Sequence, residues 1–161
     1  MGQPNKQVLL KKPALKIKAV GWLARREHTR AELLKKLQPF AEEPDDVLAV
    51  LEELRQGGWQ SDERFARAFT HHKSQRQGAA LVAQGMRQKG VPDEVITDTL
   101  QALVGSEYGR ARDVWEKKFA HQGPPTDHKS WARQARFLAS RGFAADVIRR
   151  VLGSKGDPDN D

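Results

Sequence analysis

The sequence predicts an all-α fold built from tandem three-helix repeats. Apolar residues recur at i, i+3, i+4 and i+7, as in Val47, Val50, Leu51 and Leu54, which is the period of one helix face. No segment shows the alternation of a strand, and all eight prolines fall outside the expected helix interiors. The same apolar pattern also returns at an interval of about 50 residues, which is long enough for three helices.

The internal repeat defines three units. Leu33, Leu37, Val47, Leu51 and Leu54 align with Val82, Met86, Ile96, Leu100 and Leu103, and in the next register Met86, Gly90, Val95, Ile96 and Leu100 align with Leu138, Gly142, Val147, Ile148 and Leu152. We therefore predict a flexible basic leader over residues 1–14, repeats over 15–60, 61–104 and 105–153, and an acidic disordered tail over 154–161.

In the first repeat, a short helix is expected from about residue 15 to 26. Thr29 and Glu32 have the spacing of a capping box, which starts a second helix that runs through Leu37. Pro39 ends that helix, and Pro44, followed by two acids, opens a third that continues to residue 56.

The joint to the second repeat follows directly. Gly57 and Gly58 stop the third helix, because glycine readily adopts the left-handed turn beyond a helix end, and Ser61 can cap the next one. Trp59 lies in the elbow, where we expect it to pack against both helices. Phe65, Ala68, Phe69 and His72 share the predicted inner face of the next helix.

The second repeat is expected to have one helix over 62–75, a second that ends at residue 89 and a third that begins at Pro92. Three further helices are expected after residue 106, in the third repeat. Gly90 and Gly142 are their joints. Gly21, Gly85 and Gly109 fall inside helices, where each costs about 1 kcal/mol relative to alanine. Close helix packing, fraying or a wrong boundary would each explain them.

Composition narrows the class of protein. Lysine and arginine number 28 against 21 aspartates and glutamates, for a net charge of +7, which suits an anionic partner such as nucleic acid or an acidic protein surface. Cysteine is absent, so disulfides and thiolate zinc sites are excluded. The sequence shows no signal peptide or membrane span, and we expect a soluble, cytoplasmic monomer.

No motif indicates catalysis. HExxH, GxxxxGK[ST], GxGxxG and nucleophile-elbow patterns are all missing. His71 and His72 are adjacent on a helix and point in different directions, so they do not form a chelating pair. We therefore expect no metal, no cofactor and no enzymatic activity.

Two groups of basic residues are the candidate contacts: Arg25, Arg26, Arg30, Lys35 and Lys36 in the first repeat, and Arg133, Arg136 and Arg141 in the third. No acid lies between Lys129 and Arg141, so this face would attract phosphate or an acidic groove. A solvated helix face is the simpler interpretation of both groups. The four tryptophans could stack on bases, although core packing suits their positions better.

Three stretches resemble the RecX family of regulators of the bacterial RecA recombinase. They are residues 24–33 (ARREHTRAEL), residues 62–69 (DERFARAF), and Arg141-Gly142-Phe143 ahead of Val147-Ile148. The resemblance implies tandem three-helix repeats in an elongated, curved molecule. It also implies binding to RecA–DNA filaments and inhibition of filament extension, ATPase, strand-exchange and coprotease activities, and hence a role in DNA repair and the SOS response.

On this basis we expect RecA filaments as the partner, with single- or double-stranded DNA as a further contact. Two alternatives stay open at this point: a direct DNA-binding protein that coats nucleic acid, and a helical adaptor for another protein.

Overall fold

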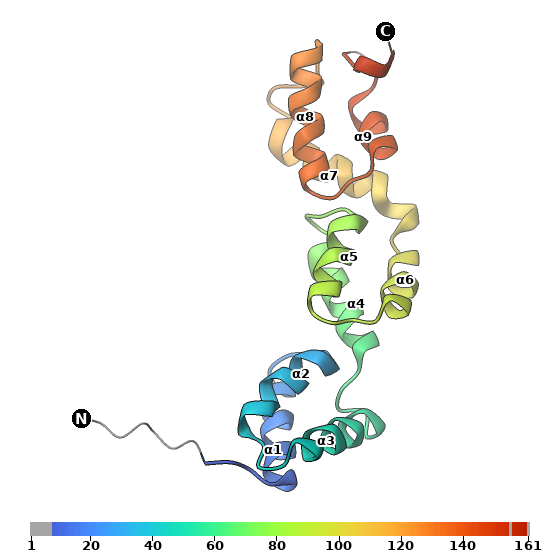
Figure 1. Cartoon of the computed structure of the whole chain (residues 1–161). Helices are drawn as coiled ribbons and strands as arrows, with labels where there is room; N and C mark the ends of the chain where they lie inside the picture. Colours follow the sequence, from blue (N-terminus) through green and yellow to red (C-terminus); the bar gives the residue numbers. More distant parts are fainter. Residues whose placement is uncertain (1–7, 155, 161) are drawn as a thin grey trace, which may run out of the picture. The chain divides into compact units, whose positions relative to one another are not determined.

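The computed structural model describes residues 8–154 and 156–160, and over these residues it is built of α-helices with no named strand (Figure 1). This confirms the all-α prediction and the tandem three-helix order. The helices are α1 Lys12–Leu23, α2 Arg30–Leu37, α3 Pro44–Gln56, α4 Asp62–Lys73, α5 Ala79–Gln88, α6 Asp93–Gln101, α7 Glu107–Phe119, α8 His128–Ser140 and α9 Ala145–Leu152. Short 3-10 turns cover Gln38–Phe40, Val104–Ser106 and Pro158–Asn160.

The described chain divides into two compact units. The first comprises residues 8–68 and 87–95, and the second comprises 69–86, 96–154 and 156–160. The predicted repeats over 15–60, 61–104 and 105–153 do not coincide with these two units, because residues 61–104 are divided between them. The three-repeat division therefore stays a prediction.

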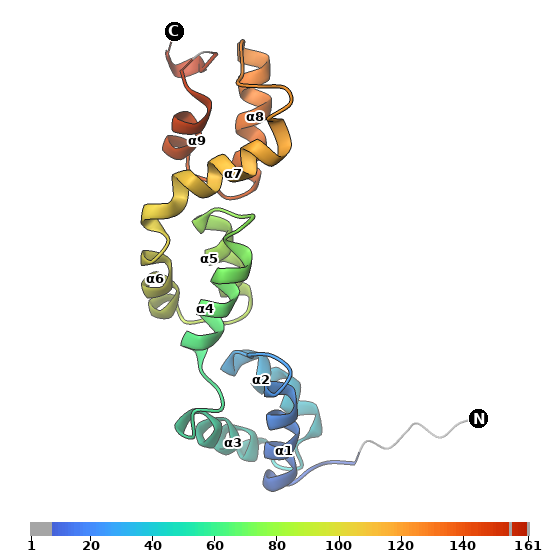
Figure 2. The same ribbon diagram turned by 180° about the vertical axis from the view of Figure 1, so that it is seen from behind.

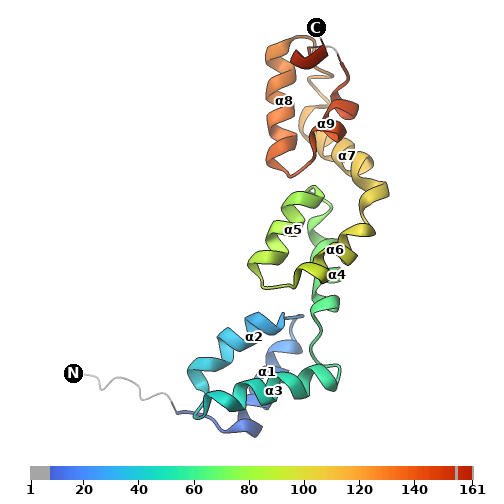
Figure 3. The same ribbon diagram turned by 45° about the vertical axis from the view of Figure 1, so that its right-hand side comes forward.

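The core of the first unit lies between α1, α2 and α3, which group together in the two views (Figure 1, Figure 3). The four residues that predicted the inner face of α3 are all buried in it, together with Leu15, Leu33 and Leu37. A parallel bridge between Leu10 and Ala41 ties part of the expected leader to the turn before α3. Residues 1–7 of that leader lie outside the described residues.

The core of the second unit lies between α7, α8 and α9, whose mutual packing is visible from behind (Figure 2). It buries Trp131, Leu138, Phe143, Ile148 and Leu152. Leu138, Ile148 and Leu152 are apolar positions that the internal repeat predicted, whereas the repeat did not include Phe143.

The joints between helices use glycines in the left-handed region, as predicted. Gly58, Gly90 and Gly142 have φ angles of 75°, 81° and 87°. A Cβ on Gly90 would lie 2.4 Å from the Cβ of Ala31, and one on Gly142 would lie 2.5 Å from the Cβ of Leu81. Gly90 and Gly142 are required both for the turn and for the close approach of another helix, whereas Gly58 is required for the turn alone.

The three glycines inside helices have different explanations. A Cβ on Gly85 would lie 2.7 Å from the Phe69 ring, so close packing explains this glycine. Gly21 and Gly109 have open space where a Cβ would lie, so packing does not explain them.

The predicted inner face of α4 is wrong in part. Phe65 is buried, but Ala68 and His72 are exposed, and Ala66 and Thr70 are buried instead. The buried face is partly polar, since the Thr70 hydroxyl donates to Met86 Sδ at 3.8 Å, and an apolar pattern cannot reveal such a face.

Trp59 does not pack between the two helices as predicted, because its side chain is 54% exposed. Its indole lies beside Gly57, and the neighbouring Gln60 takes the buried position. The Gln60 amide donates to His28 O at 3.3 Å and to Asp62 Oδ1 at 3.0 Å, so hydrogen bonding decides which residue enters the joint.

The described part of the C-terminal segment differs from a disordered tail. Gly156 accepts a hydrogen bond from His128 Nδ1 at 2.9 Å through its carbonyl. Asp157 is only 5% exposed and its Oδ2 lies 3.4 Å from Arg149 Nε. This pairing with a cation of α9 holds the segment against the third repeat.

Candidate functional site

Part of the first predicted basic group lines one hollow of about 400 Å³ beside α2. Arg26, Lys35 and Lys36 meet Arg87 and Lys89 from the end of α5, and we call this site the α2 hollow. Arg87 and Lys89 are separated from α2 by a long stretch of sequence and were not predicted as contacts. The α2 hollow therefore brings five cations together around one concavity.

A specific contact brings the end of α5 to α2. Thr29 caps α2 by accepting from the Glu32 amide at 3.0 Å, and its hydroxyl donates to the Lys89 carbonyl at 2.6 Å. The turn at Gly90 then passes close to Ala31. The α2 hollow is therefore held by backbone and capping contacts and does not depend on its own basic side chains.

Glu32 is the only carboxylate among the residues lining the α2 hollow. It accepts from Arg26 Nη1 at 2.9 Å, and Lys89 Nζ lies 3.9 Å from its other oxygen. The predicted capping box is therefore half formed, because Thr29 caps the helix while the Glu32 carboxylate turns to the cations. Lys35, Lys36 and Arg87 are left without that partner, so the hollow keeps a positive excess.

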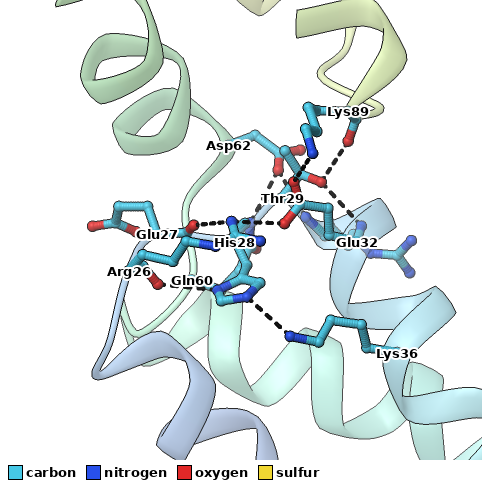
Figure 4. A network of polar contacts seen from close by, with 10 residues as sticks. Arg26, Glu27, His28, Thr29, Glu32, Lys36, Gln60, Asp62 and Lys89 are labelled. Atoms are coloured by element: carbon cyan, nitrogen blue, oxygen red, sulfur yellow. Dashed lines mark hydrogen bonds and ion pairs between the residues drawn. The ribbon is translucent and has the colours of Figure 1, made fainter. Parts of the chain in front are cut away.

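A buried imidazole positions one of these cations, as Figure 4 shows. His28 is 2% exposed, its Nδ1 lies 3.0 Å from the Arg26 carbonyl, and its Nε2 lies 3.3 Å from Lys36 Nζ. An ammonium group only donates, so Nε2 must accept and Nδ1 must carry the proton. Lys36 also lies 4.2 Å from the centroid of the Trp22 ring, which fixes it further.

Burial lowers the pKa of His28 below its usual value. The hydrogen bond to the Arg26 carbonyl opposes this, while the charges of Arg26 and Lys36 lower the pKa further. The neutral imidazole that the geometry requires is therefore also the form that its surroundings favour.

The other members of the first group lie elsewhere. Arg30 lines a separate hollow with Arg55, Arg64, Asp62 and Glu63, whose charges are nearly balanced. Its backbone amide donates to Asp62 Oδ1 at 2.9 Å. Arg25 is exposed just beyond α1 and lines none of the hollows described here.

The second predicted group is also divided. Arg133 and Arg136 line a hollow of about 340 Å³ with Lys129, Ser130 and Asp127. Asp127 is committed to capping α8, where it accepts from the Ser130 amide at 2.8 Å, and this bond lowers the pKa of the Asp127 carboxyl.

Arg141 lines a different hollow, with Arg76, Lys117 and Lys118. We call it the Phe137 hollow after the aromatic residue that lines it. Sequence reasoning missed these three partners, although the adjacent Lys117 and Lys118 in the last turn of α7 were a visible signal.

Other classes of site have no support in the part of the chain that the structure describes. No three His, Cys, Asp or Glu side chains in residues 8–154 and 156–160 gather into a metal-binding group. Within the same residues, no helix has the length and apolar character needed to cross a membrane.

Tandem three-helix repeats with cations gathered around open hollows define a helical binding protein. Residues 61–100 match the family model described as RecX, second three-helix domain, and residues 106–152 match RecX, third three-helix domain. The chain belongs to the RecX family of regulatory proteins.

Individual relatives agree with this assignment. The Regulatory protein RecX of Chromobacterium violaceum is 46% identical over 146 residues, covering 91% of this chain and 93% of its own. That of Leptothrix cholodnii is 44% identical over 139 residues, covering 86% and 87%. The crystal structure of RecX from Lactobacillus salivarius superposes with a TM-score of 0.79 over 88% of this chain and 94% of its own, at 17% identity, so it supports the fold.

Proposed function

We propose that the protein binds RecA nucleoprotein filaments in the cytoplasm and inhibits their extension, and with it the ATPase, recombinase and coprotease activities of the filament. The observation that carries this proposal is the identity of 46% to a Regulatory protein RecX over 91% of the chain. Because the relatives are named as regulatory proteins, a role without catalysis of its own follows most directly.

The proposed mechanism is a shift between filament states. A ligand shifts a conformational equilibrium only by its difference in affinity for the two states. A helical protein that contacts neighbouring RecA protomers, and DNA where it is accessible, would favour the state that fits it and disfavour the active one. The proposed contacts remain Arg25, Arg26, Arg30, Lys35, Lys36, Arg133, Arg136 and Arg141, to which the α2 hollow adds Arg87 and Lys89.

The test is RecA ATPase activity on single-stranded DNA, with the protein titrated at fixed DNA and then at several DNA concentrations. We expect inhibition at far fewer molecules than RecA protomers, unchanged by additional DNA. Inhibition that follows the ratio of protein to nucleotide would instead identify a DNA-coating protein. No inhibition would favour an adaptor for another partner.

A charge-reversal pair connects the inhibition to the α2 hollow. The double variant Lys35→Glu/Arg87→Glu should raise the half-inhibiting concentration about tenfold, if each reversed contact contributes about 0.7 kcal/mol. Lys11→Glu/Arg67→Glu is the matched control, because it makes the same charge change at exposed cations that line none of these hollows. Equal inhibition by both double variants would remove the α2 hollow from the interface.

A further inference from the structure

The Phe137 hollow has a composition that the other hollows lack. It has a volume of about 400 Å³, and four cations, Arg76, Lys117, Lys118 and Arg141, surround the apolar side chains of Val114 and Phe137. No carboxylate lines it. Among the residues that the structure describes, none of these four cations forms an ion pair, in contrast to Arg26 beside Glu32 in the α2 hollow. It is therefore an unneutralised site with an apolar centre.

The hollow is held in place by contacts that do not involve its charges. Gly78 N donates to the Arg141 carbonyl at 2.6 Å, which joins the turn before α5 to the end of α8. Arg110 Nη1 donates to the carbonyls of Ser74 at 3.0 Å and Gln77 at 2.7 Å, and these two residues flank Arg76. The cations thus converge on a preformed concavity, which limits the ordering cost of binding.

The Phe137 ring has little room for a nucleic-acid base. The Arg141 guanidinium lies 5.1 Å from its centroid and Lys118 Nζ lies 5.8 Å from it. Phe119 packs against it edge-on, with centroids 5.2 Å apart and planes at 89°. Stacking of a flat base needs an open ring face, and here the Arg141 guanidinium and the Lys118 ammonium lie over the phenyl ring.

The geometry points to a protein ligand: we propose that the Phe137 hollow binds an acidic peptide segment of the partner, with a small aliphatic side chain against the parts of Val114 and Phe137 that line the hollow and flanking carboxylates on the four cations. Carboxylates on either side of an apolar residue match cations around an apolar centre. A nucleic acid would have to place a base on the Phe137 ring, and the cations over that ring oppose such stacking. This inference rests on the proposed function, because it uses Arg141, one of the proposed RecA contacts, and it makes that contact one between proteins.

The test measures the fluorescence anisotropy of a short labelled peptide of alternating acidic residues and leucine, titrated with the full chain. The comparison probes are the same peptide with Asn and Gln in place of Asp and Glu, and a labelled oligothymidylate. We expect the acidic peptide to bind at least about tenfold more tightly than its amide counterpart, since several charge contacts are lost together.

Two double variants locate the binding. Lys117 and Lys118 are both exposed, so Lys117→Glu/Lys118→Glu should keep the helical circular-dichroism signal and weaken peptide binding about tenfold. Lys11→Glu/Arg67→Glu is the matched control at exposed cations outside the described hollows, and it should bind the peptide as the wild type does. Peptide binding unchanged by the Lys117 and Lys118 pair would overturn the proposal. The proposal would also be overturned if Lys117→Glu/Lys118→Glu lost binding to oligothymidylate and kept binding to the peptide, since this would identify a nucleic-acid surface.

The RecA ATPase titration separates this inference from the proposed function. A chain that inhibits RecA but does not bind the acidic peptide would refute the docking site and leave the function standing. A chain that binds the peptide through Lys117 and Lys118 but does not inhibit RecA would refute the function and leave the docking site.

Discussion

At the scale of single residues, His28 is the most constrained polar group of the first unit. Its ring spans the Arg26 carbonyl and the Lys36 ammonium group, and its own carbonyl accepts from Gln60. Protonation would place an N–H opposite the Lys36 ammonium, which also only donates. The imidazole must stay neutral for the network to persist.

This arrangement predicts a loss of stability in mild acid. The folded pKa of His28 lies below its ordinary value, so the unfolded chain takes up a proton first as the pH falls. The contribution of His28 to stability is therefore complete above the unfolded pKa of about 6.5 and decreases as the pH falls through the window below it. Urea unfolding at about pH 7.5 and about pH 5.5 should show this decrease.

The variant His28→Gln should reduce that pH dependence, even though it lowers stability at neutral pH. The control is His71→Gln, since His71 is exposed on α4. If the free energy of unfolding of His28→Gln changes with pH as much as that of the wild type, another group is responsible for the pH dependence.

At the scale of elements, the glycine joints determine how consecutive helices meet. Gly142 has a φ of 87°, and a Cβ there would lie 2.7 Å from the backbone nitrogen of Leu81. Gly21, in contrast, is inside α1 with nothing near the position of a Cβ. The same substitution should therefore have opposite effects at the two sites.

We expect Gly142→Ala to lower the free energy of unfolding by about 2 kcal/mol or more, from the left-handed backbone and the clash with α5. Gly21→Ala should raise it by up to about 1 kcal/mol, because alanine favours the helix and meets no neighbour. Chemical denaturation of the two variants beside the wild type measures both. If Gly142→Ala raised the free energy of unfolding instead, a side chain at this joint would cause no strain.

The helices and joints could be predicted because their signals are local. Apolar spacing gave the buried face of α3, and Gly58, Gly90 and Gly142 have the expected left-handed backbone. The hollows could not be predicted in the same way. Lys35 meets Arg87 because of a bond from Thr29 to the Lys89 carbonyl, and Lys117 meets Arg141 because the turn at Gly78 contacts the end of α8. Helix periodicity carries no information about such distant pairs.

At the scale of the whole molecule, the net charge is +7, and the hollows differ in how many cations and acids line them. The α2 hollow holds five cations with one acid, and the Phe137 hollow holds four cations with none, whereas the hollow around Arg30 is nearly balanced. Charge that is concentrated in this way affects association more strongly than the same charge spread evenly over a surface.

Inhibition of RecA should therefore weaken as salt rises, because screening shortens the reach of exposed charges to about 8 Å near physiological ionic strength. Half-inhibiting concentrations measured over a salt series, with a parallel series for RecA alone, would quantify this. Lys35→Glu/Arg87→Glu should show a shallower dependence than the wild type. Equal salt dependence would mean that these cations do not take part in the association.

The contacts that set the joints use the peptide backbone on at least one side. Thr29 donates to the carbonyl of Lys89, Gln60 to that of His28, Gly78 to that of Arg141 and Trp131 to that of Gly153. A carbonyl is present whatever side chain its residue carries. These contacts therefore do not depend on the side chain at a position such as 89. Backbone contacts of this kind fit a fold shared at a TM-score of 0.79 with only 17% identity, because a carbonyl persists when the side chain of its residue changes.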